Sequence, residues 1–411
     1  MADQAADLAR LVRLEDPRFY EGDVEASYLR LRDEEPVFYY APLDMFVVSR
    51  YHDIRDIAAR PREFSSAQGL LLTEYRHALI ATTSFVDDFF NPEARFLEFA
   101  DPPEHRLLRN LLAPSFHPKA VAARQERLAD HCASLLAEIP AGRPVEFVSA
   151  VASRLPVLVV CDLLGISDID FAQALAWSDA LESLSAGAQS ADSLRRAVDV
   201  FGTLREFLLA EFARCRESGS GDLIAGLLRQ SLDGEPISDD MAFVYVSALL
   251  ASNDTSRSLL AGLMIALAEH PDQLRRLVRD PGLAGAAVDE GLRWVTPARG
   301  FGRTAQADTQ AAGRRIRAGQ RVYMLFASGN RDPRAFPDPA RFDISRPDPL
   351  PHLSFGTGPH ICLAAQLVRA EATTLLHALV SRFSAISIID EPVPVRGILR
   401  NGWEKLWLTF T

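Results

Sequence analysis

The chain has 411 residues, of which 48% are hydrophobic and 24% are charged, a balance typical of a globular protein with a large buried core. This composition argues against a disordered chain. The formal net charge of -11 at pH 7 argues against a nucleic-acid partner, because binding to phosphates needs clustered Lys and Arg.

The first residues carry no targeting signal. Residues 1–20 mix acidic and basic side chains with Leu and Ala, and so lack the apolar core of a signal peptide. The most apolar later run, residues 155–164, contains a Pro and an Asp and is too short to span a bilayer. Four cysteines without a C-x-x-C pair favour neither structural zinc nor a disulfide scaffold. We therefore expect a cytoplasmic protein that does not bind to a membrane.

The hydrophobic pattern predicts a large helical body with a small β region. Runs of β-branched and aromatic residues at 37–40 and 45–49 predict a hairpin. Strand character returns at residues 314–326, 385–389 and 406–410. Apolar residues at three- and four-residue spacing predict helices, for example at 119–139 and 194–217. No repeat or linker divides the chain, so we expect one domain over residues 1–411 with a mainly α, α+β fold.

A long helix is predicted over residues 241–269, between a cap at Ser238 and a stop at Pro271. Both flanks are apolar on nearly every face, so the helix should pass through the core. Its middle, residues 252–256, is polar, and burial of such groups without partners is unfavourable. Two interpretations remain open: Thr255 bonds the carbonyl of Ala251 and bends the helix, or it serves in chemistry.

The strongest signal is the octapeptide Phe-Gly-Thr-Gly-Pro-His-Ile-Cys at residues 355–362, before a helix predicted at 363–383. Its glycines permit a tight turn and a close approach to a large flat ligand. Cys362 then lies at a helix N-terminus, where free N–H groups favour the thiolate. A thiolate held in this way suits the iron of a porphyrin. A buried free cysteine after a glycine turn is the alternative for Cys362 taken alone.

This segment resembles the signature F-x-x-G-x-[H/R]-x-C-x-[G/A] of the cytochrome P-450 superfamily, in its soluble bacterial type. Ala364 stands where glycine is commoner. The resemblance implies a triangular helical body with a long central helix over haem b. It also implies that Cys362 binds the haem iron, that His360 faces a propionate, and that further haem contacts come from Ala251, Phe355 and Gly356.

Other segments match the family in the same order. Residues 251–255 resemble [A/G]-G-x-[D/E]-T, with Ser252 in place of the usual glycine. The resemblance implies that Asp254 and Thr255 are the acid and the alcohol that pass protons during oxygen activation. Residues 101–109 resemble D-P-P-E-H-x-x-x-R, which implies propionate contacts from three residues, His105, Arg109 and the later Arg303.

A Glu-x-x-Arg pair, Glu290 and Arg293, would be a surface ion pair if it stood alone. Its position before Arg341 and the cysteine segment resembles the family order instead. The resemblance implies that Glu290, Arg293 and Arg341 form a buried cluster with a structural role.

The implied activity is that of a monooxygenase, which inserts one atom of O2 into a small to medium hydrophobic organic substrate by hydroxylation or oxidative dealkylation. No phosphate-binding loop or flavin segment is evident, so the electrons should come from outside this chain. The resemblance implies that a ferredoxin and its NAD(P)H-dependent reductase supply them. Arg106 and Arg124 are candidates to receive an acidic ferredoxin. Arg299 is a candidate to bind a substrate carboxylate, unless it faces solvent. The candidates for lining the substrate pocket are Phe85, Phe89, Phe90, Ser247, Leu250, Ala298, Arg299 and Phe301.

Two other functions remain open. Peroxide-driven or coupling-type oxidation would use the same haem fold but would not need the Asp254–Thr255 pair. A non-catalytic haem-binding protein would lack that pair, which is present here.

Overall fold

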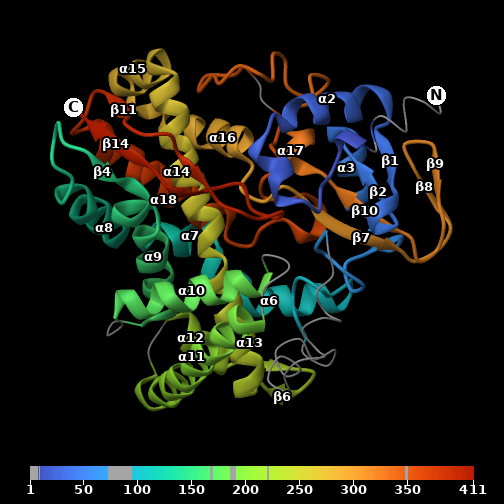
Figure 1. The fold of residues 1–411 in the computed structure, drawn as a ribbon. Coiled ribbons are helices and arrows are strands. Elements are labelled where there is room, and N and C mark those ends of the chain that lie inside the picture. The colour runs from blue at the N-terminus through green and yellow to red at the C-terminus, as the bar shows by residue number, and fades with distance from the viewer. Residues whose placement is uncertain are drawn as a thin grey trace.

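The computed structural model describes residues 8, 10–72, 95–166, 170–185, 191–219, 222–347 and 350–411. Helices dominate, as predicted for a mainly α fold. The main sheet lies on the side of the N-terminus, and a smaller sheet lies near the C-terminus (Figure 1). The helices of the described residues are α2 (Val24–Glu34), α3 (Tyr51–Ala58), α6 (Glu104–Phe116), α7 (Pro118–Ala122), α8 (Gln125–Ala137), α9 (Arg154–Leu164), α10 (Phe171–Ser185), α11 (Ala191–Ser218), α12 (Leu223–Leu228), α13 (Asp239–Ala251), α14 (Asn253–Glu269), α15 (Pro271–Arg279), α16 (Ala284–Val295), α17 (Phe326–Gly329) and α18 (Ala365–Val380).

The main sheet joins residues near the N-terminus to residues 301–324. Its strand order is β1-β2-β10-β7-β3, in which β2 and β10 are parallel and the other pairs are antiparallel. The predicted hairpin is confirmed, with Val37 opposite Val48. The strands of the main sheet are β1 (Val37–Tyr40), β2 (Met45–Val48), β3 (Phe64–Ser65), β7 (Phe301–Ala305) and β10 (Arg321–Met324). Smaller sheets contain β4 (Val145–Glu146), β5 (Ser231–Leu232), β6 (Glu235–Pro236), β8 (Thr309–Ala311), β9 (Arg314–Ile316), β11 (Ile386–Ile388), β12 (Val393–Pro394), β13 (Trp403–Lys405) and β14 (Trp407–Phe410).

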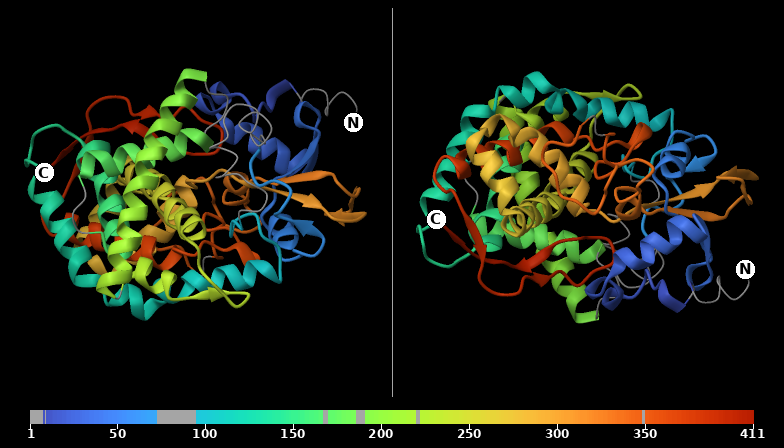
Figure 2. Two further views of the ribbon diagram at one scale, coloured as in Figure 1. Left: turned by 90° about the horizontal axis from the view of Figure 1, so that it is seen from below. Right: turned by 90° about the horizontal axis from the view of Figure 1, so that it is seen from above.

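The predicted central helix passes through the core as expected, with α14 enclosed by other segments in both views of Figure 2. Its N-terminal cap is also confirmed, since Ser238 accepts a hydrogen bond from the Met241 amide. The expected single helix over residues 241–269 is wrong, however, because the chain breaks into α13 and α14 at Ser252.

Side-chain oxygens explain this break. The Ser252 hydroxyl donates to the Leu249 carbonyl at 2.7 Å, and the Thr255 hydroxyl donates to the Ser252 carbonyl at 3.0 Å. Hydroxyls that bond to nearby carbonyls compete with the helical pattern and distort it. The polar middle of the helix therefore interrupts the backbone hydrogen bonds of the helix within the motif of residues 251–255.

The helix predicted at 119–139 is two helices, α7 and α8, which meet at Ala123 and Arg124. Arg124 donates from Nη1 to the Ala120 carbonyl at 3.0 Å and so covers the end of α7. Within the described parts of the chain, no helix is both long enough and apolar enough to cross a bilayer.

Glu371 is a buried acid without a hydrogen-bond partner among the described residues at its Oε1 atom. It lies on α18, and burial raises its pKa to about 8. Because the unfolded chain ionises this group near its ordinary value, the folded state holds one more proton than the unfolded state between about pH 4.5 and pH 8. Stability contributed by the neutral form is therefore lost as the pH rises through this window.

We predict that the unfolding free energy of wild type falls, relative to that of Glu371→Gln, by about 3 kcal/mol between pH 5 and pH 8. Urea titrations of both proteins at the two pH values measure this difference. Any fixed effect of the amide cancels, because only the change with pH is compared. Parallel pH profiles would show that Glu371 is ionised in the folded protein.

Candidate functional site

The segment that carries Cys362 is a closed loop held by backbone hydrogen bonds. The Cys362 amide donates to the Phe355 carbonyl at 2.7 Å, and the Gly356 amide donates to the Leu353 carbonyl at 2.8 Å. Gly356 and Gly358 have φ values of 70° and 74°, which favour glycine. A Cβ atom on Gly358 would also collide with the Ala58 carbonyl. The glycines therefore fix how the loop packs against α3.

Cys362 lies half-buried just before α18. Burial raises the pKa of the Cys362 thiol and acts against the effect expected from the helix terminus. The Ala364 amide and the guanidinium groups of Arg109 and Arg369 lower that pKa by smaller amounts. A metal cation at the sulfur would offset the unfavourable ionisation of the buried Cys362 thiol, since a coordinated thiol loses its proton.

Arg369 supports the loop from α18. Its guanidinium lies 4.7 Å from the centroid of the Phe355 ring, and its Nε donates to Asp289 at 2.7 Å. His352 lies beside Arg369, 3.4 Å from Asp289 and with its ring centroid 5.2 Å from that of Phe355. Through Asp289, these contacts link Phe355 at the start of the cysteine loop to α16.

The structure brings together four of the residues predicted to contact propionates. The rings of His105 and His360 are in contact, with centroids 4.0 Å apart and an interplanar angle of 45°, and Arg109 donates to the Ile361 carbonyl at 2.8 Å. Burial lowers the pKa of His360 to about 3, with further lowering by Arg303, His105 and Arg109. Burial likewise lowers the pKa of Arg303 to about 10. The four side chains thus form a basic cluster, in which His105 and Arg303 are buried and Arg109 and His360 are half-buried.

This basic cluster is not neutralised within the described residues. None of its four members forms an ion pair there, and His105 Nε2 is buried without a hydrogen-bond partner. The nearby Asp101 carboxylate accepts from the Ser66 amide at 2.8 Å and from the Ser65 hydroxyl. Since buried donors and cations need partners, the cluster fits an anionic ligand.

The central helix presents an open face near its break. Between residues 242 and 256, the residues that are not buried are Ala248, Ala251, Ser252 and Thr255. This spacing places them on one side of the helix. Thr255 is exposed there and donates to the Ser252 carbonyl, so the alternative in which it bonds the Ala251 carbonyl is not observed.

Asp254 lies beside this open face but is buried. Its Oδ1 atom lies 2.5 Å from Arg257 Nη2 and 2.8 Å from Arg400 Nη1. Arg257 also contacts Asp179 of α10 at 3.2 Å. Sequence reasoning missed both arginines. Arg257, three residues after Asp254, could have been found from helical spacing, whereas nothing in the sequence points to Arg400.

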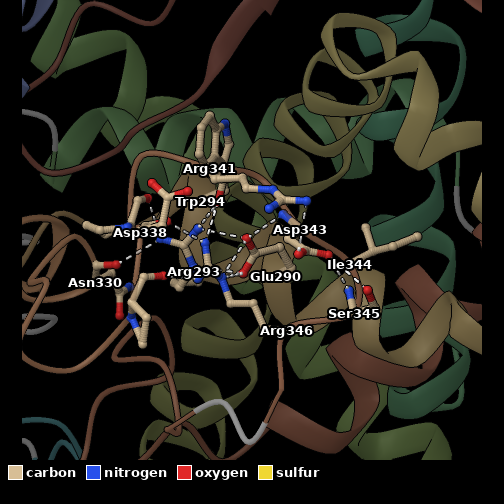
Figure 3. Close-up of polar contacts among 12 residues, drawn as sticks. Glu290, Arg293, Trp294, Asn330, Asp338, Arg341, Asp343, Ile344, Ser345 and Arg346 are labelled. Carbon is tan, nitrogen blue, oxygen red and sulfur yellow. Dashed lines mark hydrogen bonds and ion pairs between the residues drawn. The ribbon is translucent and has the colours of Figure 1, made fainter.

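The Glu-Arg pair is a buried ion cluster, but one arginine of the prediction is wrong (Figure 3). Glu290 and Arg293 form two hydrogen bonds of 2.7 Å, and Arg346 Nε contacts both Glu290 oxygens at 3.0 Å. The Arg341 side chain is instead 60% exposed and lies 3.6 Å from Asp343. Only its backbone carbonyl joins the cluster, where it accepts from Arg293 and Arg346.

The candidates for lining a substrate pocket lie in different surroundings. Phe85, Phe89 and Phe90 lie outside the described residues. Ser247 and Leu250 are buried on α13. Ala298 is buried, and its backbone forms an isolated antiparallel β-bridge with that of Arg400. Phe301, at the start of β7, packs on Phe326.

Arg299 does not face solvent, which rules out that alternative. It is buried, donates to the carbonyls of Gly397 and Arg400, and lies 4.0 Å from the centroid of the Tyr20 ring. Its contacts are therefore those of a residue that holds the C-terminal segment in place.

Comparisons with known proteins agree with this arrangement. The cytochrome P-450 family model matches residues 283–396. A steroid C26-monooxygenase of Mycobacterium tuberculosis is 30% identical over 405 residues, covering 97% of each chain. The cyclomarin C epoxidase CymV of Salinispora arenicola is 34% identical over 369 residues, covering 88% of this chain and 89% of that one. The structure of Mycobacterium marinum CYP268A2 with pseudoionone is similar with a TM-score of 0.85 and 28% identity, covering 97% and 98% of the two chains.

We predict that Arg346→Gln lowers the free energy of unfolding by about 3 kcal/mol, because it leaves the Glu290–Arg293 pair buried with one cation fewer. Chemical denaturation followed by circular dichroism measures this loss. Arg341→Gln is the matched control and should change stability by no more than about 0.5 kcal/mol, since its side chain is exposed. If Arg341→Gln lowered the free energy of unfolding more than Arg346→Gln, the Arg341 side chain would belong to the cluster after all.

Proposed function

The chain belongs to the cytochrome P-450 family and is a haem-thiolate monooxygenase that uses haem b; we propose that Cys362 binds the iron and that the substrate is a small to medium hydrophobic organic molecule. The bound haem supplies the redox chemistry by which one atom of dioxygen enters the substrate. We propose hydroxylation or oxidative dealkylation as the outcome. The observation that carries this proposal is the basic cluster beside the Cys362 loop.

The residues present fit haem b. Haem carries two carboxylates and an iron that accepts a thiolate. The protein offers a cysteine before a helix and, next to it, Arg109 and Arg303 without carboxylate partners among the described residues. His105 adds an unpartnered buried Nε2. We assign His105, Arg109, Arg303 and His360 to the propionates, and Ala251, Phe355 and Gly356 to further haem contacts.

Asp254 and Thr255 are the residues that we assign to proton delivery. Thr255 carries a hydroxyl on the open face of the helix, and Asp254 is the buried acid directly before it. A carboxylate and a hydroxyl in sequence can take up a proton from water and pass it on. The break at Ser252 supports this role, because it leaves these groups where the helical ladder is already interrupted.

Two observations support a hydrophobic substrate. The open face of α13 begins with two small apolar side chains, Ala248 and Ala251, which leave space and offer little polarity. Similar proteins are named for organic compounds, namely a steroid and cyclomarin C, and one is solved in complex with pseudoionone. The described contacts of Arg299 give no support to a substrate carboxylate at that residue.

We further propose that a ferredoxin and its NAD(P)H-dependent reductase supply the electrons. The surface beside the cysteine loop combines an exposed Arg106 with two apolar side chains, Leu107 and Ile361, each 46% exposed. A groove of about 550 Å³ runs nearby between α18 and the pair α7 and α8. Cations around an apolar centre suit an acidic protein that docks briefly.

We also propose that residues 1–411 form one catalytic domain that works in the cytoplasm. The similar solved structure covers 97% of the chain, in support of one domain. All four cysteines are free, as expected in a reducing compartment.

We predict that the dithionite-reduced protein gives a long-wavelength Soret band with carbon monoxide, and that Cys362→Ala loses this band. The reason is that the band depends on a thiolate ligand, which alanine cannot supply. Optical spectra with and without carbon monoxide make the measurement, and Cys132→Ala, a buried cysteine of α8, is the matched control. A histidine-type carbonyl spectrum in the wild type would overturn the assignment of Cys362.

We predict that Arg106→Glu slows reduction by a plant-type ferredoxin roughly tenfold at low ionic strength, because it places an acid where an acidic partner docks. Stopped-flow reduction at several salt concentrations measures the effect, which should shrink as salt rises. Arg279→Glu, at the exposed end of α15, serves as the control. Equal rates for both variants would place the docking surface elsewhere.

A further inference from the structure

We infer that Arg400 is a positioning residue for proton delivery, which anchors one oxygen of the Asp254 carboxylate and leaves the other oxygen, Oδ2, to carry the proton. The inference rests on the proposed role of Asp254. It adds a residue from the C-terminal segment, far from the motif that contains Asp254.

The two oxygens of Asp254 have different surroundings. Both arginine contacts fall on Oδ1, at 2.5 Å for Arg257 and 2.8 Å for Arg400. Oδ2 is buried and has no hydrogen-bond partner among the described residues. An ionised carboxylate has room for about four hydrogen bonds over its two oxygens, so this one-sided arrangement leaves a buried acceptor open.

Arg400 is a built-in partner, because its segment fits closely along α14. Gly402 faces Ser258, and a Cβ atom there would collide with the Ser258 hydroxyl. Trp403 faces Gly262, where a Cβ atom would come within 2.6 Å of the indole ring. Asp254, Ser258 and Gly262 are spaced by four residues and lie on one side of the helix. The segment 400–403 thus covers a continuous stripe that starts at Asp254.

The other side of this segment is held by the residues after α16. The Arg299 side chain donates to the Arg400 carbonyl and, at 3.0 Å, to the Gly397 carbonyl. The Arg299 amide donates to the Leu399 carbonyl at 2.9 Å, and the Asn401 amide donates to the Pro297 carbonyl at 2.8 Å. These bonds fix the backbone on both sides of Arg400 and so direct its side chain.

Arg400 and Arg257 reach Asp254 from different parts of the fold. Arg257 is divided between Asp254 and Asp179, which belongs to α10. Arg400 reaches Asp254 from outside both helices. Both guanidinium groups lie at Oδ1, the Arg400 contact being an ion pair without hydrogen-bond geometry, and their attraction favours one orientation of the carboxylate. Oδ2 can then accept a proton from water and release it, and Asp254 ends in its starting state.

The variants for the test are Arg400→Met, which removes the charge, and Arg400→Lys, which keeps it. Asp254→Asn serves as the reference variant, because it shows how large the effect is when the carboxylic acid itself is lost. Arg396→Met is the matched control, because Arg396 lies on the same segment with its side chain 84% exposed and only a 4.0 Å contact to Glu21. All are prepared as haem-loaded full-length protein.

The first readout is thermal melting in a double-mutant cycle. Arg400→Met should lower the melting temperature by about 2 °C in the wild-type background and by much less in the Asp254→Asn background, because the shared contact is already lost there. Equal shifts in both backgrounds would show that Arg400 stabilises the protein without Asp254, and would overturn the inference.

The second readout is the kinetic solvent isotope effect on dioxygen consumption, driven by excess plant-type ferredoxin, its reductase and NADPH. We expect Asp254→Asn and Arg400→Met each to raise this effect roughly twofold, since proton delivery becomes slower. Arg400→Lys should restore most of the wild-type value, and Arg396→Met should not change it.

The outcomes separate the two proposals. If Asp254→Asn leaves the isotope effect unchanged, the proposed role of Asp254 fails. If Asp254→Asn raises the effect and Arg400→Met does not, the role of Asp254 stands and the inference about Arg400 alone is wrong.

Discussion

The buried ion cluster of Glu290, Arg293 and Arg346 is the constraint on which the cysteine loop depends. Removing these charges from water is unfavourable unless every donor and acceptor finds a partner. Arg293 meets this need by donating to the carbonyls of Asn330 and Pro339 as well as to Glu290. The cluster therefore gathers residues 330–346 around the C-terminal turn of α16, and it can do so only if those residues fold in one way.

Asn330 links the ion cluster to the cysteine loop through hydrogen bonds of its side chain. Its Nδ2 donates to the hydroxyls of Thr296 and Ser354, and its Oδ1 accepts from the Leu353 amide at 2.7 Å. The Leu353 carbonyl accepts in turn from Gly356 within the loop. A continuous path of buried hydrogen bonds thus links the ion cluster to the residues before Cys362. The structural cluster and the predicted iron ligand are parts of one packing arrangement.

Sequence reasoning succeeded where the interactions are local and failed where a distant segment supplies the partner. The cap at Ser238, the hairpin at β1 and β2 and the first Glu-Arg pair depend on residues within a few positions of each other. The choice between Arg341 and Arg346 depends on the turn that follows Asp338, where φ is 48°, and no spacing rule reveals which guanidinium turns inward. Arg400 was missed for the same reason, since its partner Asp254 lies on another element. Some local features were missed as well. The polar middle of the long helix was noticed, but not its competition for carbonyls at Ser252, and the break at Ala123 and Arg124 was not predicted.

The basic cluster shows how the fold and the cofactor depend on each other. In the protein alone, burial and three neighbouring groups lower the pKa of His360 to about 3, so His360 is neutral at physiological pH. The charges that meet an anion are then those of Arg109 and Arg303, whose pKa values burial also lowers. An anionic ligand would offset the unfavourable burial of both guanidinium groups and would bind the folded state only. Haem binding should therefore stabilise the region between α6, β7 and the cysteine loop more than any other part of the described chain.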